Sequence, residues 1–397
     1  MGGAGAPRRV LIAAAGLAVV AAFASGCGSP QKAATGDSGG DTTPVKVGLV
    51  YSQTGVLASY GKQYEEGFKA GLAYATGGTN KIGKRPVEVT EMDDAGDPQK
   101  AVSAAKDLIG KGVKILAGST ASGVALQVAP LAAQNKVLFI SGPAATDGIT
   151  GINRYTFRSG RQSYQDVLTA KSFMGDANGK KVVVFAQDSA FGKANVAAVQ
   201  AVLKGATVTP VLVPASATDF TPFATQAKNL KPDLLFVAWA GTTASAMWTS
   251  LDQQGVLGST TVVTGLDIRA SWPIFGAAGS KVSLLAHYFD GATDNDATKA
   301  LRQAVPGGQT DLFHPDGFAA AQMIVHAVQQ GGDDVDKMVK ALEGYTFDSV
   351  KGKMTVRAED HAMLQPMFQA KFDNGKPVLV KALDPQDTAP PVVQMKG

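Results

Sequence analysis

The sequence predicts an α/β protein made of two doubly wound lobes with parallel sheets, joined by a hinge of several crossovers. Short β-branched runs alternate with longer amphipathic stretches, which is typical of strands that alternate with helices. Runs such as VVVF and LLFVA are apolar on both faces, as parallel strands are when helices cover both sides of their sheet. The alternation occurs as two consecutive series, so we expect one lobe from each series.

The first series begins after residue 44 and supplies the first lobe. We expect its strands at Val45–Tyr51, Val87–Met92, Lys114–Ala117 and Val137–Ile140, with helices that include Tyr64–Tyr74 and Gln99–Ile109. The second series has expected strands at Lys181–Ala186, Thr207–Val213, Leu234–Ala238 and Thr260–Thr264, with helices at Gln162–Met174, Lys193–Leu203 and Thr243–Gln253.

The C-terminal part of the body has a different pattern. We expect helices at Asp316–Gln330 and Val335–Leu342, then strands at Lys353–Arg357, Met367–Phe372 and Val378–Ala382. The economical arrangement is that these elements complete both lobes by crossing back between them, which makes a hinge rather than a simple linker. We therefore assign residues 45–158 with 287–350 to the first lobe, 159–286 with 351–383 to the second, and 384–397 to an extended tail.

The N-terminus has the order of a secretory signal. Arg8 and Arg9 precede an apolar run over residues 10–23, and small residues lead to Cys27, the one cysteine of the chain. The apolar run is too short to span a bilayer as a helix. The region resembles a bacterial lipobox, so we expect a lipoprotein signal over 1–26 and lipidation of Cys27; an ordinary signal with an incidental cysteine is the alternative. Residues 27–44 are polar and predict a flexible tether.

Composition excludes several classes of function. The formal net charge of +4 falls to about +2 once Arg8 and Arg9 are removed, and no basic run suggests nucleic-acid binding. Four scattered histidines and one cysteine give no zinc site, and a single cysteine leaves no internal disulfide. No nucleophile motif or dinucleotide-binding motif is present, so we expect neither an enzyme nor a cofactor.

Several strings together resemble a known family. The strings are PVKVGLVYSQTGVLASYGKQYEEGFKAGL, VTEMDDAGDPQKAV, LAGSTASG, FISGPAATD, QDSAFGKANVAAV, DLLFVAWAG and RAEDHAMLQPMF. Their order and spacing resemble the branched-chain (Leu/Ile/Val) amino-acid binding proteins, the type I periplasmic-binding-protein receptors of ABC importers. In the two-cysteine members a disulfide joins two loops whose equivalents here are Gly96 and Ala121, in keeping with the single cysteine.

The resemblance implies a receptor outside the cytoplasm, and the lipobox-like string around Cys27 predicts that lipid anchors it to the outer face of the cell membrane. Such a protein is a monomer that closes two lobes around a small amphiphilic ligand and then meets ABC permease subunits. We expect it to contact the membrane through the lipid alone and to bind no nucleic acid.

Ser122 is expected to open a helix after the strand that ends at Ala117. A hydroxyl and free backbone N–H groups at a helix N-terminus suit a carboxylate, although a plain N-cap is the alternative. The resemblance implies that Ser122 binds the ligand's carboxylate. It also implies that Ala144 and Thr146 accept from the ligand's ammonium through a backbone carbonyl and a hydroxyl; a turn with a capping threonine is the alternative.

The resemblance places further ligand contacts on both lobes. Asp267 follows a strand end and would meet the ammonium, because a partly dehydrated cation needs an opposite charge; a helix cap is the alternative. Tyr60, Phe191 and Phe313 would line the cleft, or else belong to the surface or the core. Where branched-chain binders have a tyrosine, Thr242 is the equivalent residue.

The second-lobe wall therefore differs from that of branched-chain binders. Bulky Trp239 lies near Thr242, so aromatic acids, amides or other small organic acids are alternatives to a hydrophobic amino acid. Arg161 lies near the first crossover and would serve a second acid group on the ligand if it reached the cleft; a salt bridge at the hinge is the alternative. A sensory receptor domain shares this fold and is a third class of function.

Overall fold

The computed structural model describes residues 1–2, 41–275, 279 and 281–396. The chain divides into two units, Met1–Gly40 and Asp41–Gly397, and the fold is that of the second unit. The expected signal sequence, Cys27 and most of the expected tether lie outside the described residues. Residues 41–44 of that tether are held by Arg85, whose Nε donates to the Thr43 carbonyl at 2.7 Å and forms an ion pair with Asp41 at 3.3 Å.

The first lobe contains a six-stranded sheet with the order β2-β3-β1-β4-β5-β6. Its strands are β1 (Val45–Tyr51), β2 (Lys81–Ile82), β3 (Arg85–Asp93), β4 (Ile115–Gly118), β5 (Leu138–Ser141) and β6 (Thr156–Arg158). Neighbouring strands are parallel except for β2, which pairs antiparallel with β3.

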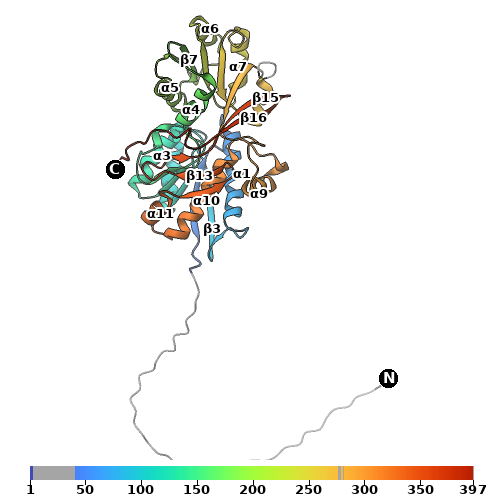
Figure 1. Cartoon of the computed structure of the whole chain (residues 1–397). Coiled ribbons are helices and arrows are strands. Elements are labelled where there is room, and N and C mark those ends of the chain that lie inside the picture. The colour runs from blue at the N-terminus through green and yellow to red at the C-terminus, as the bar shows by residue number, and fades with distance from the viewer. Residues whose placement is uncertain (3–40, 276–278, 280, 397) are drawn as a thin grey trace, which may run out of the picture. The chain divides into compact units, whose positions relative to one another are not determined.

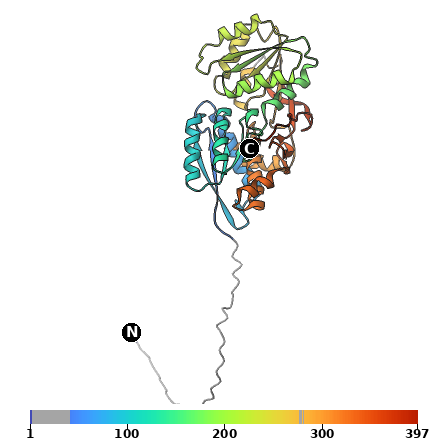
Figure 2. The ribbon, with the colours of Figure 1, turned by 90° about the vertical axis from the view of Figure 1, so that its left-hand side faces the viewer.

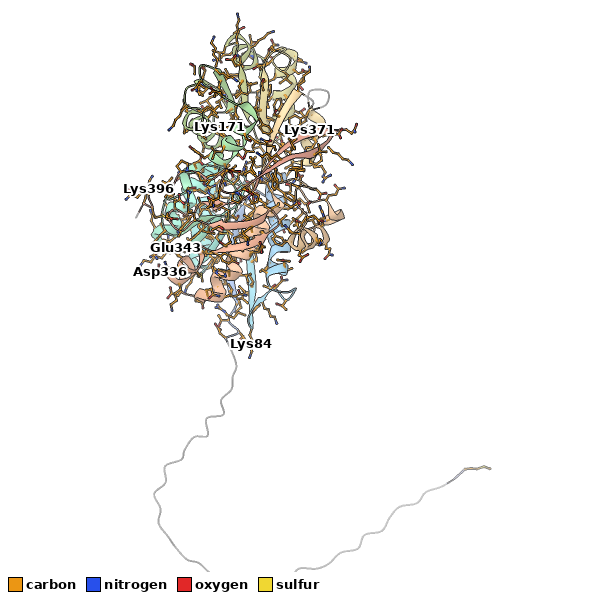
Figure 3. All side chains as sticks on the ribbon, viewed as in Figure 1. Lys84, Lys171, Asp336, Glu343, Lys371 and Lys396 are labelled. Atoms are coloured by element: carbon orange, nitrogen blue, oxygen red, sulfur yellow. The ribbon has the colours of Figure 1, made fainter. Side chains whose placement is uncertain are left out.

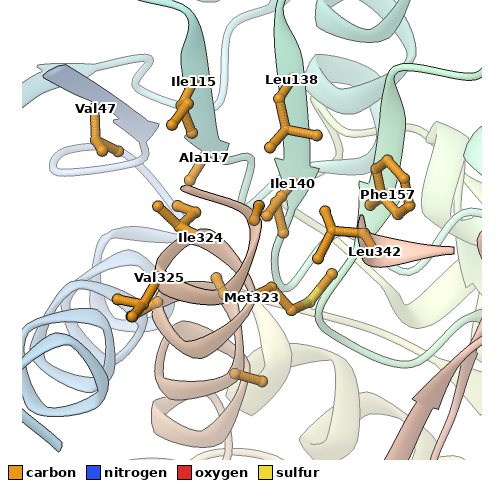
Figure 4. Packing of buried hydrophobic residues seen from close by; sticks show 14 of the residues in the cluster. Val47, Ile115, Ala117, Leu138, Ile140, Phe157, Met323, Ile324, Val325 and Leu342 are labelled. Atoms are coloured by element: carbon orange, nitrogen blue, oxygen red, sulfur yellow. The ribbon is translucent and has the colours of Figure 1, made fainter. Parts of the chain in front are cut away.

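Helices cover both faces of this sheet, as the apolar strands require. On one face lie α1 (Ala58–Ala75), α10 (His314–Gly331) and α11 (Val335–Leu342), and their side chains share a core with Val47 and Ile115 (Figure 4). On the other face lie α2 (Pro98–Gly110) and α3 (Ser122–Gln134), which pack against Val50 and Leu116. Figure 2 shows α3 in cyan and α10 with α11 in orange on opposite sides.

The second lobe contains a seven-stranded sheet with the order β16-β15-β11-β10-β9-β7-β8. Its strands are β7 (Lys181–Gln187), β8 (Thr207–Val213), β9 (Leu234–Ala238), β10 (Thr261–Gly265), β11 (Val282–Ala286), β15 (Met367–Asp373) and β16 (Lys376–Leu383). One face carries α4 (Ser163–Met174) and α5 (Ala190–Val202), and the other carries α6 (Thr221–Asn229), α7 (Ala244–Gln253) and α8 (Trp272–Phe275) (Figure 1).

The sheets are mixed rather than wholly parallel. Strand β15 pairs antiparallel with β11 on one side and with β16 on the other, and a tight turn joins β15 and β16 into a hairpin. The sequence analysis did not anticipate β11, which forms the parallel neighbour of β10. With this adjustment the α/β class and the two doubly wound lobes are confirmed.

Three late strands form a small separate sheet. Their packing shows that the expected boundary between the lobes at residue 351 is wrong. These are β12 (Thr346–Ser349), β13 (Gly352–Val356) and β14 (Met363–Leu364). Met354, Val356 and Met363 pack in the same core as α10 and α11. Residues 352–364 thus pack with the first lobe, and only the β15–β16 hairpin of the expected 351–383 segment joins the second sheet.

The chain passes between the lobes at three crossovers, after β6, after β11 and after β14. The tail after β16 then returns to the first lobe, where Lys396 N donates to the Gly151 carbonyl at 2.9 Å and Val393 N donates to Asp360 Oδ2 at 3.0 Å. In Figure 3, Lys396 accordingly lies beside the first lobe, whereas Lys171 and Lys371 lie on the second. The α9 helix (Asp296–Ala304) packs against α1 in the first lobe.

Helices α1 and α10 approach each other so closely that their crossing requires glycine. A Cβ at Gly67 would lie 1.9 Å from the His314 carbonyl oxygen, and one at Gly317 would lie 1.9 Å from the Tyr64 carbonyl oxygen. Both obstacles are backbone atoms, which cannot swing aside as a flexible side chain would. This contact positions Tyr60 and Phe313, at the starts of the two helices, beside each other.

We predict that Gly67→Ala lowers the free energy of unfolding by about 3 kcal/mol, the upper part of the usual range for overpacking. Gly110→Ala is the matched control, because Gly110 is also helical and a Cβ there would have no neighbour within 4 Å. The control should change stability by less than about 1 kcal/mol, in the stabilising direction. Denaturant unfolding at 25 °C measures both, and equal effects would contradict the prediction.

Candidate functional site

A cavity of about 360 Å³ lies between the two lobes, at the carboxyl ends of their parallel strands. Loops that follow β4, β5, β7, β9, β10 and β11 all contribute to its wall. This edge is where open α/β sheets bind ligands, because loops and helix N-termini converge there. The volume lies within the range of small-molecule sites in proteins.

The first-lobe wall is built around the N-terminus of α3. Ala121, Ser122 and Gly123 line the cavity, and the Ser122 hydroxyl accepts a hydrogen bond from Thr146 N at 3.2 Å. The Ser122 hydroxyl hydrogen therefore remains available for an acceptor on a ligand. Together with the N–H groups of the first turn and the helix dipole, it makes a binding place for a carboxylate.

The structure does not bring Ala144 or Thr146 to the cavity wall. Ala144 is 1% exposed and packs in the core beneath α3. Thr146 caps a short 3-10 helix, η1 (Asp147–Ile149), by accepting from Gly148 N at 3.2 Å, and its carbonyl accepts from Arg158 Nη2 at 2.6 Å. The capping alternative thus accounts for Thr146, while the neighbouring Pro143 and Ala145 line the cavity.

The second-lobe wall is aromatic. Trp239 and Phe191 line the cavity, and Trp239 is fixed by a hydrogen bond from its Nε1 to Thr243 Oγ1 at 3.0 Å. The Trp239 ring also packs on Phe185, with ring centroids 5.8 Å apart. Thr242, in contrast, is exposed and does not line the cavity, so Trp239 is the residue that shapes this wall.

Tyr60 and Asp267 form a hydrogen bond across the two lobes. The Tyr60 hydroxyl donates to Asp267 Oδ1 at 2.6 Å and accepts from Gly241 N at 3.1 Å. Asp267 Oδ1 also accepts from Ile268 N at 2.7 Å. Burial raises the pKa of the Asp267 carboxyl, and the Tyr60 hydrogen bond opposes this rise.

Phe313 completes the wall beside this pair. Its ring lies 4.5 Å from the ring of Tyr60 and 5.3 Å from that of His287, centroid to centroid. On the same side, the Arg161 guanidinium carbon lies 5.9 Å from the Phe313 centroid. Arg161 also lines the cavity and donates through Nη1 to the Pro143 carbonyl at 2.8 Å, so the hinge arginine does reach the cleft.

The sequence model of a family described as periplasmic binding protein matches residues 44–377. The chain belongs to this family. It is 26% identical to a Leu/Ile/Val-binding protein homolog 3 of Brucella melitensis over 343 residues, which cover 84% of this chain and 92% of that relative.

Two solved structures show the same fold. An ABC-type branched-chain amino acid transporter protein of Rhodopseudomonas palustris is 33% identical, with a TM-score of 0.71 over 89% of this chain and all of that chain. A solute-binding protein of R. palustris in complex with 4-hydroxybenzoate is 23% identical, with a TM-score of 0.77 over 87% of this chain and 96% of that chain.

As a periplasmic binding protein the chain is a substrate-binding protein of an ABC transporter, and not an enzyme. It works outside the cytoplasm, binds a small molecule and acts with ABC permease subunits. Among its described residues, no helix is long and apolar enough to cross a membrane. The same residues contain no cluster of His, Cys, Asp and Glu that suits a metal ion.

Sequence reasoning missed two titratable residues of this periplasmic binding protein's cavity, Asp166 and His287. Asp166 lies in the first turn of α4, where a favourable interaction with the helix dipole is enough to explain an acidic residue in the sequence. His287 follows β11, the strand that the sequence analysis did not anticipate. Burial, with Arg161 and Lys351 nearby, holds the pKa of His287 well below its usual range, so this imidazole is neutral.

Burial raises the pKa of Asp166 from 3.8 to about 6, although the Arg161 guanidinium opposes the rise. The folded protein therefore holds a proton on Asp166 at pH values where the unfolded chain has lost it. Binding of this proton stabilises the folded state at low pH, and the stabilisation is lost as the pH rises through about 6.

We predict that the free energy of unfolding of the wild type, minus that of Asp166→Asn, rises by about 2.5 kcal/mol as the pH falls from about 7.5 to about 4. Asparagine does not titrate, so the difference isolates the Asp166 carboxyl. Denaturant unfolding at several pH values measures it, with Asp252→Asn as the same substitution on an exposed position of α7. Parallel pH profiles for the wild type and Asp166→Asn would show that the Asp166 carboxyl is not the source of the pH dependence of stability.

Proposed function

We propose that this receptor binds a small amphiphilic carboxylic acid between its lobes, and that a hydrophobic amino acid such as Leu, Ile or Val is the first candidate. The observation that carries the proposal is the cavity, which joins the N-terminus of α3 to an aromatic wall and the partly buried carboxylate of Asp267. Each lobe supplies only half of these groups. A ligand that touches both halves therefore stabilises the closed form.

The ligand's polar end is placed at α3 and Asp267. Its carboxylate would accept from the Ser122 hydroxyl and from the N–H groups of the first turn. Its ammonium would meet Asp267, a carboxylate on the opposite lobe. The apolar side chain would then pack between Trp239, Phe191 and Phe313, and the curated relative named as a Leu/Ile/Val-binding protein supports this assignment.

A second candidate is an aromatic carboxylic acid without an ammonium. The observation that favours it is that Asp267 Oδ1 already accepts from the Tyr60 hydroxyl and from Ile268 N. Asp267 thus has hydrogen-bond donors without a ligand cation, and the Trp239 and Phe191 rings suit a flat apolar body.

Calorimetry on two variants separates these candidates. Asp267→Asn should weaken L-leucine binding by about 2–5 kcal/mol, because the ammonium loses its opposite charge. The same variant should affect 4-hydroxybenzoate less, because that acid carries no cation. Equal losses for the two ligands, or no L-leucine binding by the wild type, would contradict the amino-acid assignment.

Ser122→Ala should weaken both ligands by about 1–3 kcal/mol, because the backbone N–H groups still hold the carboxylate. Ser245→Ala is the matched control, since Ser245 is an exposed serine near the start of α7. Unchanged affinity of Ser122→Ala for every acid that the wild type binds would place the carboxylate elsewhere.

We also propose that Cys27 carries lipid and anchors the receptor to the outer face of the cell membrane. Cys27 lies outside the described residues, and the proposal rests on the lipobox-like string around it. Stable anchoring needs at least two acyl chains, which a diacylated N-terminal cysteine has.

Cys27→Ala should therefore move the protein from the detergent phase to the aqueous phase in a detergent partition experiment, or leave it unprocessed. Ser29→Ala, two residues further along, is the matched control and should partition as the wild type does. Equal partition of Cys27→Ala and the wild type would contradict the anchor.

A further inference from the structure

Two charged side chains at the first crossover line the cavity beside the carboxylate site. Arg161 is 9% exposed and Asp166 is 4% exposed, and Arg161 Nε lies 3.3 Å from Asp166 Oδ2. This contact engages Arg161 Nε and Asp166 Oδ2, whereas Asp166 Oδ1 has no hydrogen-bond partner within the described part of the chain. A buried acceptor without a partner is costly, so the presence of Asp166 Oδ1 in a residue of the cavity wall points to a ligand.

The neighbouring Arg158 shows what a structural arginine does at this place. Arg158 is 1% exposed, does not line the cavity, and donates to the carbonyls of Arg161 and Thr146 at 2.8 and 2.6 Å. Arg161 makes one such bond, from Nη1 to the Pro143 carbonyl. Among the described residues no hydrogen bond engages its Nη2, so a donor remains for a cavity ligand.

Asp166 is likewise not needed to cap its own helix. The Gln165 side chain accepts from Gln162 N at 3.1 Å, and Asp147 Oδ1 accepts from Tyr164 N at 3.1 Å. These two bonds satisfy backbone N–H groups at the start of α4, which an acidic side chain in the first turn could otherwise bind. The Asp166 carboxylate is therefore left to face Arg161 and the cavity.

We propose that Arg161 and Asp166 form a second polar subsite that takes an uncharged donor–acceptor group of the ligand, with a primary carboxamide as the best match. The proposal rests on the proposed function, since it requires a ligand in the same cavity. The carboxamide oxygen accepts from the Arg161 guanidinium, and its NH₂ group donates to Asp166 Oδ1. The ligand class is then a carboxylic or amino acid that carries an amide on its side chain or ring.

The same geometry discriminates against two close analogues. A second carboxylate would accept from Arg161 but would set its other oxygen against the Asp166 carboxylate, and like charges at short distance repel. A methyl or ketone group offers no hydrogen to Asp166 and leaves that acceptor buried without a partner. A preference for the amide over the isosteric acid is thus the signature of the subsite.

Titration calorimetry at about pH 7.5 tests this signature with two isosteric pairs. L-glutamine is compared with L-glutamate, and 4-carbamoylbenzoate with terephthalate, so that one pair carries an ammonium and the other does not. The wild type should bind each amide at least about tenfold more tightly than the matching acid.

Asp166→Asn should reduce this preference at least about tenfold, because it removes the repulsion and adds a donor for the acid. It should bind L-glutamate or terephthalate more tightly than the wild type does, a gain that damage to the fold does not produce. Asp252→Asn is the matched control and should keep the wild-type preference.

Equal affinities of the wild type for amide and acid, or the same preference in Asp166→Asn, would overturn the subsite. In that case L-leucine or 4-hydroxybenzoate binding that depends on Ser122 would leave the proposed function in place. Failure of all these acids and amides to bind would overturn both proposals.

Discussion

The crossovers after β6, β11 and β14 meet at one buried carboxylate, Asp316. Its Oδ1 pairs with Lys351 Nζ at 2.5 Å, and Lys351 also donates to Gln365 at the third crossover, at 2.9 Å. His287 Nε2, at the second crossover, lies 3.7 Å from Asp316 Oδ2, and a Cβ at Gly160, on the first, would lie 2.9 Å from that oxygen. Removing either partner of such a buried pair costs about 3–5 kcal/mol, so the crossovers are held together.

This arrangement turns the carboxyl ends of both sheets toward one cavity. The first lobe then offers the N-terminus of α3 and the second offers the Trp239 wall and Asp267, and neither half encloses a ligand alone. The bond from the Tyr60 hydroxyl to Asp267 crosses between these halves at 2.6 Å. In the proposed function, closure and binding therefore use the same residues, and a ligand shifts the receptor toward the form that a permease meets.

The hinge and the binding site also share residues. Arg161 and Asp166 belong to the first crossover and to the helix that follows it, yet both line the cavity. His287 belongs to the second crossover and lines the cavity as well. In the proposed function, a ligand that contacts these groups touches the segments whose backbone moves when the lobes open, which links ligand chemistry to hinge geometry.

The sequence by itself determined the α/β class, the two series of strands, and Ser122 at a helix N-terminus, because hydrophobic period and helix-start signals are local. It did not determine that β15 and β16 form a hairpin on the second sheet, that β13 packs with the first lobe, or that Thr146 caps η1 while Arg161 and Asp166 line the cavity. Those features depend on which segments pack together across long stretches of chain. Only the tertiary structure decides them, because a side chain's partner at the end of a strand comes from another element and leaves no periodic signal of its own.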